Sequence, residues 1–182
     1  MRTAKLFLAG MYLHLVLSVA APIGILYLGW GGAGWNRANG TLFLVYLGAI
    51  LLVQLLGWIS VGAAISAYRR NDVARLFSGW RTLKLGSIPF YILNFLWSVL
   101  AWGSIVAASR GIFLLLVPIP VAITWLMVLQ SGVTGWLAIR CLREEGEDLA
   151  ILWSVCQFLP VLDVAAALVL LRRFRHRAPA GR

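Results

Sequence analysis

Charged residues are scarce in this 182-residue sequence, and acidic ones most of all: six residues are Asp or Glu, against sixteen Lys or Arg. Charged residues make up 12% of the chain, whereas hydrophobic residues make up 62%. A water-soluble domain needs far more charged and polar side chains to cover its surface. The composition therefore excludes an ordinary soluble fold and indicates an integral membrane protein.

Cysteine is rare as well, and Cys141 and Cys156 lie too far apart for a CxxC redox or zinc motif. The sequence contains no HExxH, no Gly-x-Ser-x-Gly and no Gly-rich phosphate-binding loop. His14 is the single histidine within an apolar segment, which leaves haem and metal binding without support. We therefore expect no catalytic residue, no cofactor and no metal, and we interpret the protein as a non-enzyme.

The surplus of basic residues gives a formal net charge of +10. A nucleic-acid-binding domain would gather these side chains on one soluble face, but here they lie at the ends of apolar runs. We therefore expect no nucleic-acid partner. A lipid bilayer with anionic headgroups explains the charge better, because Lys and Arg accumulate in the cytoplasmic connections of membrane proteins.

Long apolar runs occupy most of the chain, and each exceeds the roughly 18 residues that indicate a membrane-spanning helix. They cover residues 6–30, 41–68, 87–109, 111–139 and 149–171. Backbone groups in lipid must be hydrogen-bonded within their own segment, so we interpret each run as a helix. The sequence thus predicts an all-α fold, a polytopic transmembrane helical bundle of about five helices. It forms a single integral-membrane domain over residues 1–182, with a basic tail at 172–182.

The distribution of basic residues also predicts orientation, since cytoplasmic connections carry their excess. The connection between the second and third segments holds five of them: Arg69, Arg70, Arg75, Arg81 and Lys84. We therefore expect this connection and the N-terminus in the cytoplasm. The first segment is read as an uncleaved anchor, because its apolar run extends beyond the signal-like Ser18-Val19-Ala20 triplet.

The last segment leaves two topologies open. Five crossings would place the basic tail outside, which conflicts with the charge rule. If the last segment enters and returns, fourteen of the sixteen Lys and Arg residues lie inside, and Pro160 divides the segment into two halves that suit a re-entrant hairpin. A kinked continuous helix is the commoner structure. We therefore expect five crossings, with the hairpin as the alternative.

The basic connection has a helical pattern of its own. Apolar residues recur through it at helical spacing: Val73, Leu76, Phe77, Trp80 and Leu83. Basic side chains surround them, which is typical of an interfacial helix on an anionic leaflet. We therefore predict an interfacial amphipathic helix over residues 70–84 that anchors the protein to the headgroups. Docking of a membrane-protein partner is the alternative.

Two motifs carry a resemblance to a known group of proteins. The first reads LKLGSIPFYILNF at residues 83–95, and the second reads FLPVLDV at residues 158–164. Over residues 82–171 the sequence resembles an uncharacterised family of small bacterial polytopic membrane proteins, a domain of unknown function. The resemblance brings no activity, but it implies a multi-pass location in the bacterial inner membrane and a shared need for Asn94 and Asp163. The sequence departs from the family pattern at Ser87 and Pro160.

Asp163 is the main candidate for a functional residue, because every other Asp and Glu lies in a connection. An ionised carboxylate inside the bilayer costs at least a few kcal/mol, so we expect Asp163 to be protonated or matched by a partner. Helix depth places it beside Gln54 if the tail is outside, and beside His14 and Asn94 if the tail is cytoplasmic. The candidate intramembrane polar site comprises Asp163, His14, Asn94, Gln54, Gln130 and Gln157.

Three functions are compatible with these residues. Polar side chains in membranes commonly form hydrogen bonds between helices, which favours a non-enzymatic accessory or scaffold module that acts by helix packing. Such a module would bind a membrane-protein partner or a second copy of itself. The alternative is a small carrier or proton-coupled channel that uses Asp163, and the third reading is an intramembrane enzyme.

Overall fold

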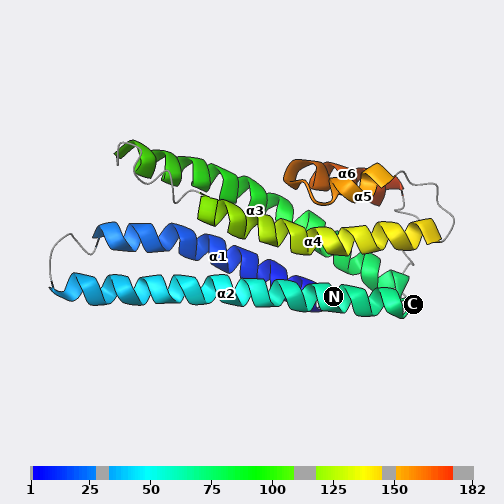
Figure 1. The fold of residues 1–182 in the computed structure, drawn as a ribbon, viewed down its shortest axis with the longest axis horizontal. Coiled ribbons are helices and arrows are strands. Elements are labelled where there is room, and N and C mark those ends of the chain that lie inside the picture. Colours follow the sequence, from blue (N-terminus) through cyan, green and yellow to red (C-terminus); the bar gives the residue numbers. More distant parts are fainter. Residues whose placement is uncertain (1, 28–32, 109–117, 145–150, 174–182) are drawn as a thin grey trace.

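The computed structural model describes residues 2–27, 33–108, 118–144 and 151–173 (Figure 1). Its helices are α1 (Arg2–Tyr27), α2 (Ala33–Arg69), α3 (Val73–Ala108), α4 (Pro118–Glu144), α5 (Ile151–Cys156) and α6 (Pro160–Arg173). No strand occurs in these four ranges. The all-α prediction is therefore confirmed for the described residues.

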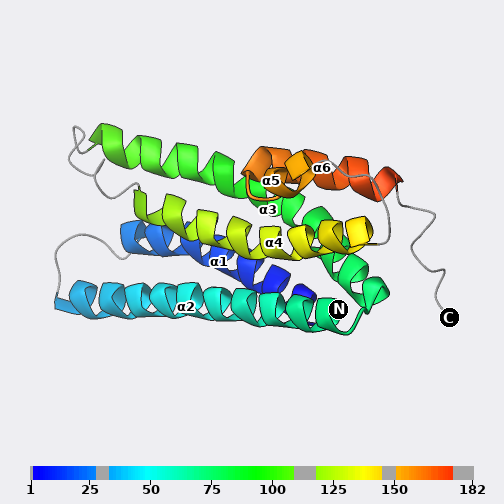
Figure 2. The same ribbon diagram turned by 45° about the vertical axis from the view of Figure 1, so that its right-hand side comes forward.

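The first four helices run alternately up and down as a bundle (Figures 1 and 2). The beginning of α1 therefore lies at the same end as the end of α2, the beginning of α3 and the end of α4. Within the described ranges, four stretches are long and apolar enough to cross a membrane: Arg2–Ala20, Gly40–Arg69, Val73–Ala101 and Pro120–Glu144. These overlap the first four apolar segments of the sequence, although the third begins at Val73 rather than at residue 87.

The described part of the fifth apolar segment forms two short helices, which corrects the prediction of one helix over residues 149–171. At a rise of 1.5 Å per residue, α5 is about 9 Å long and α6 about 21 Å, both shorter than the roughly 30 Å hydrocarbon core. Pro160 explains the break, because a proline ring clashes with the carbonyl four residues earlier, and α5 ends at Cys156. Bonds of the i to i+3 type close the turn at residues 157–159.

The chain reverses at this turn, so that α5 and α6 form a helical hairpin beside α3 and α4 (Figures 1 and 2). Trp153 of α5 and Leu170 of α6 pack against the same group of apolar residues, which includes the last part of α4. Gln157 at the tip of the hairpin lies against Gly132 and Gly135, closer to the beginning of α4. The helix α6 thus ends at Arg173 on the same end of the bundle as Arg2. The hairpin alternative describes this arrangement.

The segment predicted to be an interfacial helix is the first part of α3, which continues without a break to Ala108. Asn71 has a positive φ of 53° and turns the chain tightly after α2. Asp72 then caps α3, because its Oδ1 accepts from the backbone N–H of Arg75 at 3.0 Å. This short turn folds residues 73–84 back onto the bundle. A separate interfacial helix over residues 70–84 is therefore not formed, which corrects that prediction.

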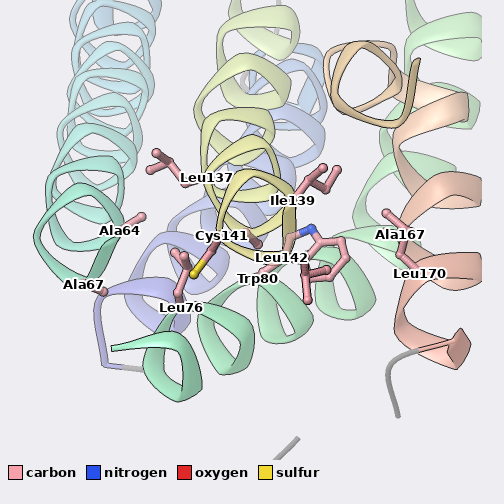
Figure 3. Close-up of a cluster of buried hydrophobic side chains, with 11 residues drawn as sticks. Ala64, Ala67, Leu76, Trp80, Leu137, Ile139, Cys141, Leu142, Ala167 and Leu170 are labelled. Atoms are coloured by element: carbon pink, nitrogen blue, oxygen red, sulfur yellow. The ribbon is translucent and has the colours of Figure 1, made fainter. Parts of the chain in front are cut away.

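Two groups of buried side chains make up the core. The hairpin cluster lies near the end where Arg2 and Arg173 lie and consists of Ala64, Ala67, Leu76, Trp80, Leu137, Ala138, Ile139, Cys141, Leu142, Ala167 and Leu170. Figure 3 shows Ala167 and Leu170 of α6 directed toward Trp80 of α3 and Ile139 of α4. The central cluster joins α1, α2, α3 and α4 through Ala4, Phe7, Met11, Leu15, Val53, Leu83, Phe90 and Met127. The hairpin therefore packs on the bundle through α3 and α4.

Candidate functional site

Asp163 lies in the first turn of α6 and is completely buried. Its Oδ1 atom accepts a hydrogen bond from the Nζ atom of Lys84 in α3, and the two side chains form an ion pair with exposed fractions of 0% and 1%. The Lys84 ammonium also donates to the hydroxyl of Ser131 in α4 at 3.1 Å. The site therefore ties α3, α4 and the hairpin together inside the protein.

The register of α3 explains why Lys84 points into the site. Trp80, Lys84, Ser87 and Tyr91 follow one another at intervals of three and four residues, so they share one helix face. The indole N–H of Trp80 donates to Gln157 Oε1 at 3.3 Å, and the Tyr91 hydroxyl lies 3.5 Å from Ser131 Oγ. This face of α3 thus presents a ladder of polar contacts to α4 and to the hairpin.

Glycines on α4 allow the hairpin tip to approach. A Cβ atom at Gly132 would meet the carbonyl oxygen of Gln157, and one at Gly135 would overlap the Gln157 side-chain amide. Glycine is the residue that permits such close approach, because it has no side chain. The two glycines therefore set the depth of Gln157, and with it the position of Asp163 opposite Lys84.

Burial makes this pair strongly interdependent. Removing one partner of a buried ion pair leaves an uncompensated charge and typically costs about 3–5 kcal/mol. The second carboxylate oxygen of Asp163, Oδ2, is buried and has no hydrogen-bond partner among the described residues. The site can therefore fix the hairpin through Oδ1, while Oδ2 remains an acceptor that a proton or a small donor could occupy.

Gln54 and Gln130 form a separate contact between α2 and α4. The amide nitrogen of Gln130 donates to the Gln54 side-chain oxygen at 2.9 Å and to the Gln54 carbonyl at 3.2 Å. Gly57 makes room for this amide on α2, because a Cβ atom there would overlap Gln130. These two predicted residues thus pair with each other and have no recorded contact with Asp163.

The remaining predicted residues also lie in separate contacts. His14 is buried on α1, with its Nε2 atom 3.4 Å from the Tyr46 hydroxyl of α2. Asn94 of α3 donates to the hydroxyl of Thr124 in α4 at 3.2 Å. The six candidates therefore do not form one polar site. Gln54, His14 and Asn94, which depth along the helices favoured as partners of Asp163, do not pair with it.

The partner that sequence reasoning missed is Lys84, which it placed among the basic residues at the membrane surface. Arg69, Arg70, Arg75 and Arg81 are exposed, as that prediction requires, but Lys84 is buried, and the prediction is wrong for it. The sequence does contain a signal for this burial. Lys84 follows Trp80 by four residues and Ser87 follows Leu83 by four, so both polar residues lie on the helix face that the apolar residues form. The row of apolar residues from Val73 to Leu83 is therefore the first part of the buried face of a longer helix.

Two hollows lie near the basic end of the bundle. A small cavity of about 20 Å³ between α1, α2, α3 and α4 is lined by Ser60, Arg75, Gly79 and Thr134 among others, and it has room for about one water molecule. A larger open groove of about 470 Å³ is lined by Trp136, Arg140, Arg143, Glu144 and Ser154. Neither Lys84 nor Asp163 lines either hollow.

Comparison with known proteins places the chain in a family. No match was found among curated proteins or among solved structures. The model of a family of unknown function, DUF6652, matches residues 2–176 and so includes both motifs on which the sequence resemblance rested. That resemblance is confirmed as membership of an uncharacterised family. The chain belongs to the family of unknown function DUF6652.

Proposed function

We propose that the protein is an integral membrane protein and acts as a non-enzymatic accessory or scaffold module through the packing of its helices. The observation that carries this proposal is the closed Lys84–Asp163 pair, which is buried between three helices and lines neither hollow. A buried, charged contact is thus used to hold a hairpin in place. Four helices of membrane-spanning length support the membrane location.

The proposed orientation has both the N-terminus and α6 leading to the cytoplasmic side of a bacterial inner membrane. It is supported by the charge rule, because the basic residues at the end of the bundle where α6 ends include Arg2, Arg69, Arg70, Arg75, Arg143, Arg172 and Arg173. Arg37 lies near the beginning of α2 at the opposite end, and Arg110 follows α3. Exposed arginines at the basic end, including Arg75 and Arg81, would then face anionic headgroups or a membrane-protein partner.

Pull-down in a mild detergent tests the scaffold proposal. Tagged full-length protein is crosslinked in cells, purified, and compared with an Arg75→Gln/Arg81→Gln variant. We expect one membrane protein, or a second copy of the chain, to be recovered with the wild type and at least fivefold less with the variant. Arg37→Gln is the matched control at the other end and should leave recovery unchanged. Equal recovery with all three proteins, or none with the wild type, contradicts the proposal.

A second candidate function is a proton-coupled carrier or channel, and the buried Asp163 Oδ2 atom without a partner among the described residues favours it. Proteoliposomes that contain the purified protein distinguish the two functions. A carrier predicts a pH-driven flux that is lost in Asp163→Asn while the protein level stays normal. The scaffold proposal predicts no flux with the wild type, because the carboxylate serves to hold the hairpin.

A further inference from the structure

The groove at the basic end of α4 combines a charged rim with an apolar wall. Arg140 and Arg143 are exposed at its rim, the hydroxyl-bearing Ser154 comes from α5, and Trp136 forms the apolar wall. Glu144 also lines the groove, but its carboxylate accepts hydrogen bonds from Arg140 Nε at 3.1 Å and from the Tyr68 hydroxyl. The described charged groups of the rim are thus two arginines and one glutamate, and the glutamate is paired with Arg140.

The guanidinium of Arg140 is held in a defined position. It lies 5.6 Å from the ring centre of Tyr68 and 5.8 Å from that of Trp136, so aromatic faces pack on it from α2 and α4. Among the described residues, only its Nε atom has a hydrogen-bond partner, and Arg143 has no carboxylate partner. Within the described part of the chain, the terminal guanidinium nitrogens of Arg140 and the guanidinium of Arg143 are left as donors for an anion, and the Arg140 group is preorganised.

One exposed stripe of α4 connects this rim to the apolar part of the bundle. Trp125, Leu129 and Trp136 are exposed by 41%, 38% and 37%. Together with Arg140 and Arg143, they are separated by 4, 7, 4 and 3 residues, which keeps them on one face of an α-helix. Along this stripe the exposed side chains are apolar or aromatic as far as Trp136, and the next two are the arginines. The stripe extends over 18 residues, or about 27 Å.

We propose that this groove binds an anionic phospholipid, with its phosphate on Arg140 and Arg143 and its acyl chains along Trp136, Leu129 and Trp125. The inference rests on the proposed membrane location and adds a ligand site to it. Free phosphate would need only the arginines, whereas an apolar wall that continues the charged rim matches a headgroup joined to acyl chains. Tryptophan at the boundary suits the level at which headgroup and hydrocarbon meet.

Native mass spectrometry of the full-length protein in detergent tests this site. The delipidated protein is titrated with dioleoyl-phosphatidylglycerol and, in parallel, with dioleoyl-phosphatidylcholine, which has the same chains but no net charge. We expect the anionic lipid to bind at least tenfold more tightly. The Arg140→Gln/Arg143→Gln variant should bind it about 25-fold more weakly, since each arginine near anionic lipid contributes about fivefold.

Matched variants separate a defined site from general attraction to charge. Arg69→Gln/Arg70→Gln removes two exposed arginines at the same end of the bundle but outside the groove lining, and should change the affinity less than twofold. Arg143→Gln alone should weaken binding about fivefold and leaves the Arg140 contacts with Tyr68 and Trp136 intact. It remains informative if the double variant fails to fold.

Several results would overturn the inference. Equal affinity for the two lipids, equal losses in the groove and control variants, or full binding by Arg143→Gln each contradict it. Displacement of the lipid by millimolar inorganic phosphate would assign the groove to free phosphate instead. Failure of the scaffold proposal is a separate result, because it appears as equal recovery of the partner in the pull-down while lipid selectivity is unaffected.

Discussion

Two neighbouring residues of α4, Gln130 and Ser131, take part in polar contacts on different sides of the helix, and the contacts differ in charge. Gln130 pairs through neutral amides with Gln54 of α2, a long helix that packs against α4. Ser131 accepts from Lys84, whose charge is matched by Asp163 of the short helix α6. The neutral contact joins two long helices, whereas the charged one holds an element with little length over which to pack. A charged contact thus holds the element that has the smaller length available for apolar packing.

The comparison predicts an order of energetic effects. Side-chain hydrogen bonds between membrane helices average about 0.6 kcal/mol and reach about 1.7 kcal/mol. Leaving one member of a buried ion pair without its partner costs about 3–5 kcal/mol. The stability of the hairpin should therefore depend on Asp163 much more than the α2–α4 contact depends on Gln130.

The largest effect is expected for Asp163→Ala, which strands the Lys84 ammonium in the interior. We expect the free energy of unfolding in detergent to fall by about 3–5 kcal/mol. Maleimide labelling of Cys156 on α5 should also become faster in a Cys141→Ser background, because the hairpin separates from α4. Asp163→Asn keeps the shape of the side chain and serves as the milder control. If Asp163→Ala unfolds and is labelled like the wild type, the charged contact is no more important for stability than the neutral one, which contradicts the comparison.

The next effect concerns the glycines under the hairpin tip. Gly135→Ala places a methyl group against the Gln157 amide, and we expect a loss of about 1–3 kcal/mol from overpacking. Gly62→Ala on α2 is the matched control, because no atom lies within 4 Å of a Cβ atom there. The control should stabilise its helix by up to about 1 kcal/mol. Thermal unfolding of both variants measures the difference, and equal shifts would contradict close packing at the tip.

A smaller effect is expected on the neutral side of α4. Gln130→Leu removes the amide contact with Gln54, and we expect a loss of about 0.5–1.5 kcal/mol. Adding Gln54→Leu should cost less than the sum of the two single changes, because each already removes the shared hydrogen bond. Chemical unfolding in mixed micelles measures both. A loss as large as that of Asp163→Ala would remove the distinction between the two contacts.

The smallest effect is expected at Thr134, whose hydroxyl is buried without a hydrogen-bond partner among the described residues. Thr134→Val removes this polar atom with little change of shape. We expect the protein to be unchanged or more stable by up to about 1 kcal/mol, since an unsatisfied polar group is removed. A clear loss of stability would instead indicate a water molecule in the small cavity beside Thr134.

Much of the bundle follows from the sequence because its signals are local. The first four apolar runs overlap the four stretches of membrane-spanning length, because composition sets which segments can be buried in lipid, but the bounds differ, most of all for the third, which begins at Val73. The hairpin is harder to predict from the sequence, because an apolar run is compatible with one spanning helix and with two short ones. Pro160 and the count of basic residues both favoured the hairpin, whereas the commoner behaviour of proline-containing helices favoured a kink.

The site itself was only half predictable. Asp163 stands out as an isolated acid in an apolar segment, so a compensating partner could be expected on physical grounds. The identity of that partner depends on how α3 and the hairpin meet, and no local pattern encodes this contact. Lys84 lies at the junction of an amphipathic stripe and an apolar run, where either location is compatible with its neighbours. Both motifs of the family resemblance contain one member of the pair.

The central claim, that the hairpin is held by mutual dependence of Lys84 and Asp163, is tested most directly by a double-mutant cycle. The unfolding free energies of the wild type, Lys84→Met, Asp163→Leu and the double variant are measured in one detergent. We predict that Lys84→Met reverses most of the loss caused by Asp163→Leu, with a coupling energy of at least about 2 kcal/mol. Losses that simply add in the double variant would contradict the claim.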